Sequence, residues 1–401
     1  MDDTRWLDAP VESGAAAGFG LYVHVPFCAH RCGYCDFATY VPDRVGGASM
    51  VDRYVAALHT EIARTVAAGP APLAPPGAGP ADWPTVTSLF VGGGTPTLLP
   101  AEVLVGLIDR VRTELDVLAD AEITVEANPE TVGPDVFAAL AAGGVNRISM
   151  GAQSFVGHVL ATLERGHAPE RPAAAVAEAR GAGIERVNLD LIYGTPGENE
   201  ADWEITLATA LTAGVDHVSA YALTIHDNTA FGRAVATGVL PDVDEDVQRH
   251  RFDVARDVLR VGGFEHYEVS NWSLGSGARS RHNLLYWRHG DYLAFGVGAH
   301  GHLAGRRWWN TRSVPGYVAA VENGGTPVAG AEILSVTERA EERLLLGLRV
   351  REGLHPNDVP PIDPLALEDA MAQGLVETAC GRLQATEDGW FLLDEAVRRL
   401  T

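Results

Sequence analysis

Short apolar runs alternate with stretches of helical periodicity along the first half of the chain. The apolar runs predict strands at residues 21–25, 85–91, 122–127, 146–150, 186–192 and 217–222. The periodic stretches predict helices over 49–68, 100–115, 134–142, 156–164, 172–182 and 201–213. Such repetition is typical of a parallel sheet with helices outside. Six units predict an α/β fold with an open, partial (β/α)6 barrel rather than a closed eightfold one.

The pattern changes after residue 240. A helix over 244–261, a strand at 264–269 and a turn-rich stretch at 271–281 precede a segment dense in aromatics and histidines. Amphipathic helices at 337–350 and 364–373, a short β-ribbon and a last helix at 394–400 predict a small α-rich, winged-helix-like module. We therefore divide the chain into a lead-in (1–19), the partial barrel (20–240), a barrel-completing region (241–330) and a C-terminal helical domain (331–401). Residues 67–84, rich in Pro, Gly and Ala, predict a surface loop.

Three of the four cysteines lie in one loop after the first predicted strand. Cys28, Cys32 and Cys35 have the spacing C-x3-C-x2-C, and clustered thiolates suit a soft metal centre. Three ligands leave a tetrahedral zinc site incomplete, whereas a cubane iron–sulfur cluster on three thiolates keeps one iron open. A zinc site completed by His24, His30 or a distant group stays open as the alternative.

Polar residues and glycines gather at the carboxyl ends of the predicted strands, where parallel α/β barrels place their active sites. They are Gly93, Gly94, Thr95, Glu126, Gln153 and Asp190. Arg165, predicted on the helix after Gln153, is suited to bidentate pairing with a carboxylate. Structural explanations stay open for each: a tight turn for the glycines, solvated positions for Glu126 and Arg165, and a backbone cap for Asp190.

Composition narrows the function classes. A net charge of −23 argues against a general nucleic-acid binder and favours solubility. The sequence contains no run of 18 apolar residues, so no transmembrane helix is predicted. The N-terminus lacks the layout of a secretory signal. Clustered thiols argue against a disulfide framework and favour a reducing compartment, so we expect a cytoplasmic protein.

The cysteine loop closely resembles the signature of the radical S-adenosylmethionine (SAM) superfamily. The resemblance implies a 4Fe-4S cluster on Cys28, Cys32 and Cys35, with the amino and carboxylate groups of SAM on the fourth iron. Carried over position by position, it also implies SAM contacts. These are Tyr22, Tyr34, Gly93, Gly94, Thr95, Glu126, Gln153, Arg165 and Asp190.

Over nearly its whole length the chain resembles the oxygen-independent coproporphyrinogen III oxidase-like (dehydrogenase) group of that superfamily. The motifs are Y-V-H-V-P-F-C at 22–28, G-G-G-T-P-T at 92–97, N-R-I-S-M-G at 146–151 and D-L-I-Y-G at 190–194. The true coproporphyrinogen dehydrogenases carry a further cysteine where Phe37 stands, and a longer N-terminal segment. The HemW-type heme chaperone branch has a marker similar to H-N-L-x-Y-W, which this chain carries at 282–287.

The chaperone resemblance implies a protein that binds heme and transfers it to acceptor hemoproteins, with no catalytic residue assigned. Heme iron takes an imidazole or thiolate ligand, and the macrocycle favours an apolar, aromatic surface. The predicted heme contacts are His282, Asn283, Tyr286 and Trp287. His282 is the first candidate for axial ligand and His300 and His302 are second choices, while a packing role for the marker stays open.

Two other functions remain as alternatives. The first is oxidative decarboxylation of coproporphyrinogen III, which family resemblance alone favours. The second is a zinc-stabilised scaffold without a redox role. The C-terminal module is a candidate for partner contact or for self-association into a homodimer, and the sequence does not decide between them.

Overall fold

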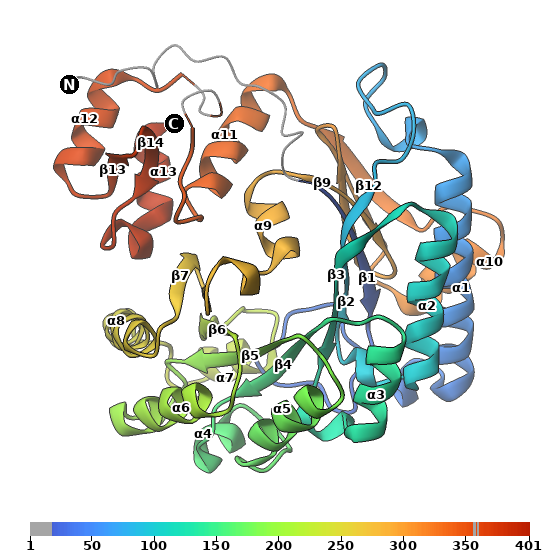
Figure 1. Ribbon diagram of the computed structural model, residues 1–401, viewed down its shortest axis with the longest axis horizontal. Coiled ribbons are helices and arrows are strands. Elements are labelled where there is room, and N and C mark those ends of the chain that lie inside the picture. The colour runs from blue at the N-terminus through green and yellow to red at the C-terminus, as the bar shows by residue number, and fades with distance from the viewer. Residues whose placement is uncertain (1–17, 356–357, 359–360) are drawn as a thin grey trace.

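The computed structural model describes residues 18–355, 358 and 361–401. It contains one curved 12-stranded sheet with helices along its outer side (Figure 1). Residues 1–17 of the predicted lead-in lie outside the described residues. Among the described helices, none has both the length and the apolar character that crossing a membrane requires.

Parallel strands that follow one another in sequence form the middle of the sheet. In β1, Leu21, Val23 and Val25 are almost fully covered, as expected for parallel strands with both faces buried. This arrangement confirms the predicted partial (β/α)6 barrel. The strands are β1 (Phe19–Val25), β2 (Val86–Gly93), β3 (Val117–Ala127), β4 (Arg147–Gln153), β5 (Arg186–Tyr193) and β6 (His217–Ala222).

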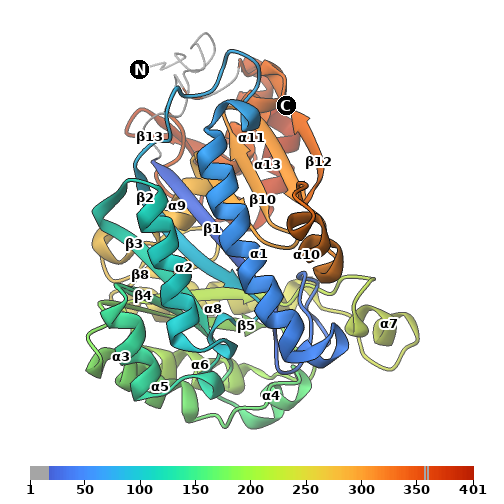
Figure 2. The ribbon, with the colours of Figure 1, turned by 90° about the vertical axis from the view of Figure 1, so that its right-hand side faces the viewer.

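Helices that connect these strands cover the outer face of the sheet, with α1 and α2 side by side (Figures 1 and 2). One short helix, α7, was not predicted and projects from the barrel in Figure 2. The helices are α1 (Gly47–Ala68), α2 (Ala101–Glu114), α3 (Pro134–Ala142), α4 (Gly157–Thr162), α5 (Arg171–Gly181), α6 (Glu200–Thr212), α7 (Ala230–Ala236) and α8 (Glu245–Val261).

The sheet extends beyond the predicted barrel on both sides. Next to β6 lie antiparallel β8 and β7, so the stretch 271–281, predicted as turns, in fact contains a strand. Next to β1 lies parallel β9, followed by antiparallel β10, β11 and β12. The elements are β7 (Glu265–Glu268), β8 (Asn271–Ser273), α9 (Arg281–Trp287), β9 (Asp291–Phe295), β10 (His300–Leu303), β11 (Arg306–Asn310), α10 (Val314–Glu322) and β12 (Val328–Ile333).

The C-terminal module has its own small core, which includes Leu344, Leu383 and Trp390. Its helices and hairpin agree with the predicted α-rich domain, although the predicted boundary at residue 330 falls inside β12. The module packs against the barrel through α11 and α9. Its elements are α11 (Val336–Gly347), α12 (Pro364–Ala372), β13 (Val376–Ala379), β14 (Arg382–Ala385) and α13 (Leu393–Leu400).

Candidate cluster site and adjoining cavity

The loop that carries the three cysteines has both ends fixed. The Cys28 N–H donates to the Tyr40 carbonyl at 3.0 Å, and the Tyr40 N–H donates to the Pro26 carbonyl at 2.7 Å. Within the loop, the Cys35 N–H donates to the Cys32 carbonyl at 3.2 Å. All three thiols are free, and all three line one cavity. The short spacing in sequence therefore becomes a common site in space.

Each of the three sulfurs has a polar neighbour. Thr95 Oγ1 lies 3.8 Å from Cys28 Sγ, Arg165 Nη1 lies 3.8 Å from Cys32 Sγ, and Thr39 Oγ1 lies 3.9 Å from Cys35 Sγ. Burial raises the pKa of the Cys28 thiol to about 11, so metal binding there must displace a proton. Hydrogen-bond donors beside the sulfurs are the groups that stabilise and tune a thiolate-bound cluster.

The zinc alternative requires four protein ligands around one ion. In the described part of the chain, no three His, Cys, Asp or Glu side chains converge as ligands of one metal. His24, one candidate for the fourth ligand in the zinc alternative, has both ring nitrogens engaged, with the Tyr22 hydroxyl at 2.9 Å and the Ala38 carbonyl at 3.0 Å. His30 is exposed beside Glu164. Three thiols that line one cavity fit a cluster, in which each thiolate binds a different iron and no fourth protein ligand is needed.

The cavity above the cysteine loop measures about 360 Å³ and lies at the carboxyl ends of the parallel strands. It brings together the three cysteines and every predicted SAM contact except Tyr22. Those contacts are Tyr34, Gly93, Gly94, Thr95, Glu126, Gln153, Arg165 and Asp190. Asn128, Ser149 and Tyr221 also line it and were not among the predicted contacts. Strand-end position was the available signal for Asn128 and Ser149.

The glycine run after β2 allows the backbone to lie directly against the cysteine loop. A Cβ at Gly94 would lie 2.7 Å from the Phe27 carbonyl oxygen and 2.9 Å from Cys28 Sγ. Gly93 has a φ of 122°, and its N–H donates to Glu126 Oε2 at 2.8 Å. Close approach therefore requires glycine here, beyond the needs of a plain turn.

Two partly buried carboxylates face the cavity, Glu126 and Asp190. Burial raises the pKa of Glu126 to about 7, against the opposing effect of the Gly93 N–H. Burial also raises the pKa of Asp190, which accepts hydrogen bonds from Asn188 Nδ2 at 2.8 Å and Ser149 Oγ at 3.1 Å. These donors are side chains, so the structure does not support the backbone-cap explanation. Both carboxylates are positioned to accept hydrogen bonds from a ligand.

Arg165 lies in the loop three residues beyond the end of α4, so its predicted position on a helix is wrong. Its Nη2 donates to Asn128 Oδ1 at 2.6 Å and to the Gly151 carbonyl at 3.1 Å. Its Nε is buried and has no hydrogen-bond partner. Because buried N–H groups are normally paired, this guanidinium fits a ligand acceptor such as a carboxylate.

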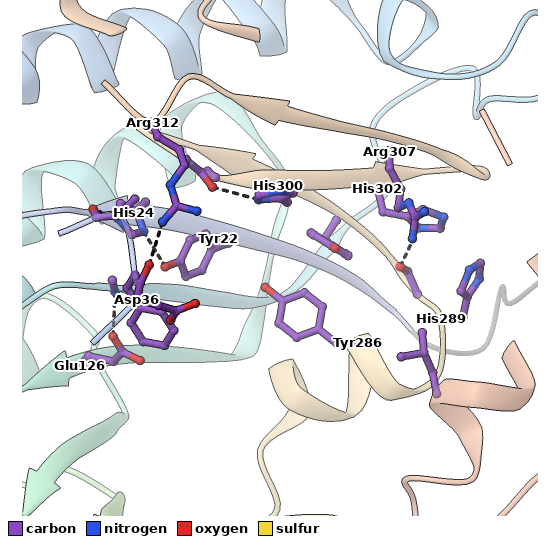
Figure 3. Close-up of a pocket in the computed structure, with 18 of the residues that line it drawn as sticks. Tyr22, His24, Asp36, Glu126, Tyr286, His289, His300, His302, Arg307 and Arg312 are labelled. Carbon is purple, nitrogen blue, oxygen red and sulfur yellow. Dashed lines mark hydrogen bonds between the residues drawn. The ribbon is translucent and has the colours of Figure 1, made fainter. Parts of the chain in front are cut away.

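A second cavity of about 620 Å³ adjoins the first (Figure 3). Asp36, Phe37, Gly93 and Glu126 line both, and Tyr22 lines only the second. The larger cavity is rich in aromatic, imidazole and guanidinium groups. These include Tyr22, Phe37, Tyr286, Tyr292, His24, His289, His300, His302, Arg307 and Arg312. The two arginines had no recognisable signal in the sequence, because the strands that carry or precede them were not predicted.

Of the four predicted heme contacts, only Tyr286 lines this cavity. His282 is 1% exposed, and its ring nitrogens lie 2.9 Å from Ser88 Oγ and 2.8 Å from the Tyr286 hydroxyl. Burial lowers the pKa of His282 to about 4. Asn283 and Trp287 also lie outside both cavities, and Trp287 packs against a small apolar cluster. An axial role for His282 would require it to give up one of its hydrogen bonds.

The fold and the cysteine site together define a radical SAM protein. The Radical SAM superfamily matches residues 22–210, and the HemN C-terminal domain matches residues 334–392. Coproporphyrinogen III oxidase (HemN) from Escherichia coli shares the fold with a TM-score of 0.79, over 99% of this chain and 91% of its own. Its sequence identity of 22% limits that likeness to the fold.

Curated relatives narrow the class. Heme chaperone HemW of Mycobacterium tuberculosis (strain ATCC 25618 / H37Rv) is 43% identical over 397 residues, covering 98% of each chain. Heme chaperone HemW of Escherichia coli (strain K12) is 34% identical over 93% of this chain and 96% of its own. The chain belongs to the HemW family.

Proposed function

We propose that this protein is a heme chaperone, which binds heme and transfers it to acceptor hemoproteins. The near full-length similarity to relatives that bear this name supports the proposal. The structural observation that carries it is the 620 Å³ cavity beside the cysteine site. Its size suits a large planar ligand, and its aromatic, imidazole and guanidinium groups match the macrocycle, iron and propionates of heme.

The smaller cavity is the proposed site of a 4Fe-4S cluster and SAM. Cys28, Cys32 and Cys35 would hold three irons, and the bound cluster would supply an electron for redox chemistry on SAM. The unpaired Nε makes Arg165 the candidate for the SAM carboxylate. Glu126, at the wall between the cavities, is the candidate for the SAM amino group.

The remaining predicted SAM contacts line the same cavity or border it. Asp190, held by Asn188 and Ser149, suits a hydroxyl-bearing part of the ligand. Tyr22 lies on the far side of the shared wall and hydrogen-bonds to His24. Free thiols and an iron–sulfur cluster both favour a reducing compartment, and we propose the cytoplasm.

The test is a heme titration of protein purified and cluster-reconstituted without oxygen. The expected result is a saturable Soret absorption at one heme per chain. Apomyoglobin added to the complex should take up heme, with a shift to the myoglobin spectrum. A titration that shows only free heme, with the cluster intact, would contradict the proposal.

Coproporphyrinogen III dehydrogenase is the competing activity, and Phe37 at the position of that branch's additional cysteine disfavours it. The same preparation, given SAM, a reductant and coproporphyrinogen III under nitrogen, is expected to form no protoporphyrinogen. Product formation would replace the chaperone proposal with the enzyme.

A further inference from the structure

We propose that His300, on β10, is the axial ligand of heme iron in the larger cavity, and that Arg312 pairs with a heme propionate. The inference rests on the proposed heme-binding function and assigns its site. It differs from the expectation drawn from the H-N-L-x-Y-W marker, which singled out His282.

The other three histidines that line the cavity are buried, whereas His300 is exposed. His24 has both nitrogens in hydrogen bonds. His289 is buried with Nε2 3.3 Å from Glu342 Oε2, and burial lowers its pKa to about 4. His302 has Nδ1 3.1 Å from the Gly290 carbonyl, and its unpartnered Nε2 is enclosed, with the His289 ring centroid 4.7 Å from its own.

His300 has the arrangement that an iron ligand requires. It is exposed, and its Nδ1 lies 2.9 Å from the Gly298 carbonyl oxygen. Because a carbonyl oxygen only accepts, Nδ1 must carry the proton, and Nε2 then presents its lone pair. A hydrogen bond at the far ring nitrogen typically fixes the tautomer and orientation of metal-binding histidines. The ring is also stacked against Trp309, its pairing partner on β11.

Arg312 supplies the matching charge. The Arg312 Nη2 donates to the Asp36 carbonyl at 2.8 Å, and no carboxylate among the described side chains forms an ion pair with this guanidinium. Arg307, by contrast, is paired with Glu332 and Glu342. A heme propionate entering the cavity therefore finds its unneutralised guanidinium at Arg312, and guanidinium–carboxylate pairing is the strong form of such a contact.

His300 and Arg312 approach the cavity from the same side. The Gly298 N–H donates to the Thr311 carbonyl at 2.9 Å. Gly298, whose carbonyl binds the His300 ring, is thereby held beside Thr311, the residue that precedes Arg312. Figure 3 shows both side chains on the sheet side of the cavity, with Tyr286 facing them from α9. Iron and propionate contacts thus come from one wall, and the opposite wall is aromatic.

The marker segment then shapes that aromatic wall. Tyr286 contacts Tyr292 edge to face at a centroid distance of 4.7 Å, and its hydroxyl is held by His282. Aromatic side chains in this arrangement offer a large apolar surface with polar groups already satisfied. His282 is accordingly a positioning residue for Tyr286.

The test compares variants of the full-length, cluster-reconstituted protein. Heme titration gives affinity, and resonance Raman of the ferrous complex gives the iron–histidine stretch. His300→Ala should abolish that band and weaken heme binding by about 10-fold or more, since even second-shell losses at metal sites cost about that much. Imidazole added to His300→Gly should restore an iron–imidazole stretching band. The matched control is His250→Ala, which removes an exposed histidine paired with Glu200 outside both cavities and should change neither readout.

Other outcomes separate this inference from the function on which it rests. If wild type binds heme and His300→Ala keeps both the band and the affinity, the ligand assignment is wrong and the chaperone proposal stands. If the iron–histidine band is lost in His282→Ala but kept in His300→Ala, His282 is the axial ligand instead. Failure of wild type to bind heme would reject the function itself. Arg312→Gln should weaken binding about 2- to 5-fold, as expected for a surface ion pair, and an unchanged affinity would overturn the propionate contact.

Discussion

The two cavities share a wall but differ in the groups that distinguish their linings: thiols line only the smaller one, and most of the aromatic side chains and imidazoles line the larger one. The smaller one is lined by thiols, carboxylates and the guanidinium groups of Arg31 and Arg165, at the ends of parallel strands and on the loops that follow them. The larger one is lined by phenols, imidazoles and arginines from β9, β10, β11 and α9. In the smaller cavity, groups such as Glu126 and Cys28 are partly buried and have polar neighbours. In the larger cavity, His300 and Arg312 are exposed.

This difference suggests a division of tasks under the proposed function. Groups that are partly buried and held by polar partners bind a resident cofactor tightly, because little freedom is lost on binding. An exposed ligand allows exchange, which a protein that hands over its cargo requires. Substitutions in one cavity should therefore leave the ligand of the other in place, except at the shared wall.

The largest expected effect that is confined to one cavity comes from substitution of a cysteine. Cys28→Ala should abolish cluster assembly, because two thiolates no longer hold three irons of the cubane. Iron and acid-labile sulfide content and the visible absorption shoulder measure this loss. The matched control, Cys380→Ala in the C-terminal module, should keep full iron content. Normal cluster content in Cys28→Ala would refute the cluster assignment.

The next largest effect is on stability and on the larger cavity. Glu122 pairs with buried Arg147 at 3.0 Å and accepts the N–H of His282 at 3.0 Å, so it joins β3 and β4 to the start of α9. Glu122→Ala should lower the free energy of unfolding by about 3–5 kcal/mol, because it leaves a buried charge unpaired. Denaturant unfolding measures this. The control variant Glu114→Ala, which removes a partly exposed ion pair with Arg110, should lower the free energy of unfolding by at most about 1 kcal/mol.

A smaller, pH-dependent effect is expected at the shared wall. The pKa of Glu126 is raised to about 7, so the carboxylate is mostly protonated below that pH and mostly ionised above it. If its carboxylate accepts a hydrogen bond from the SAM amino group, SAM affinity should rise with pH and be about 10-fold lower at pH 6 than at pH 8. Equilibrium dialysis with SAM measures the affinity. Glu126→Gln should bind more weakly and show no such rise, and an equally pH-dependent Gln variant would exclude this role.

The smallest effect is expected at Phe37, which is 62% exposed and lines both cavities. Phe37→Ala should weaken heme binding about 2- to 10-fold through loss of an aromatic contact, and should leave iron and sulfide content unchanged. The Soret titration gives the affinity. Val239→Ala, at an exposed apolar position outside both cavities, is the control. If Phe37→Ala lost the cluster, a change at the heme side of the shared wall would also affect the cluster site, contrary to the expected independence of the two cavities.

The parts of the site predicted from sequence are those that local patterns determine. The cysteine spacing, the glycine run and Glu126 at a strand end mark one edge of a parallel sheet, since the carboxyl ends of parallel strands meet. The larger cavity was not predictable in the same way, because β8 and β10 have only three or four residues and show no clear alternation. His282 illustrates the limit: its partner Ser88 is 194 residues away, so no local pattern shows that the ring is already satisfied.

The most direct test of the account is one composition measurement. Protein reconstituted and loaded with heme without oxygen is analysed for iron, acid-labile sulfide, zinc and heme. About five irons, four sulfides and one heme per chain are expected, because the proposed sites of the cluster and of heme are different cavities. Zinc in place of sulfide, or sulfide lost in proportion to heme gained, would contradict the account.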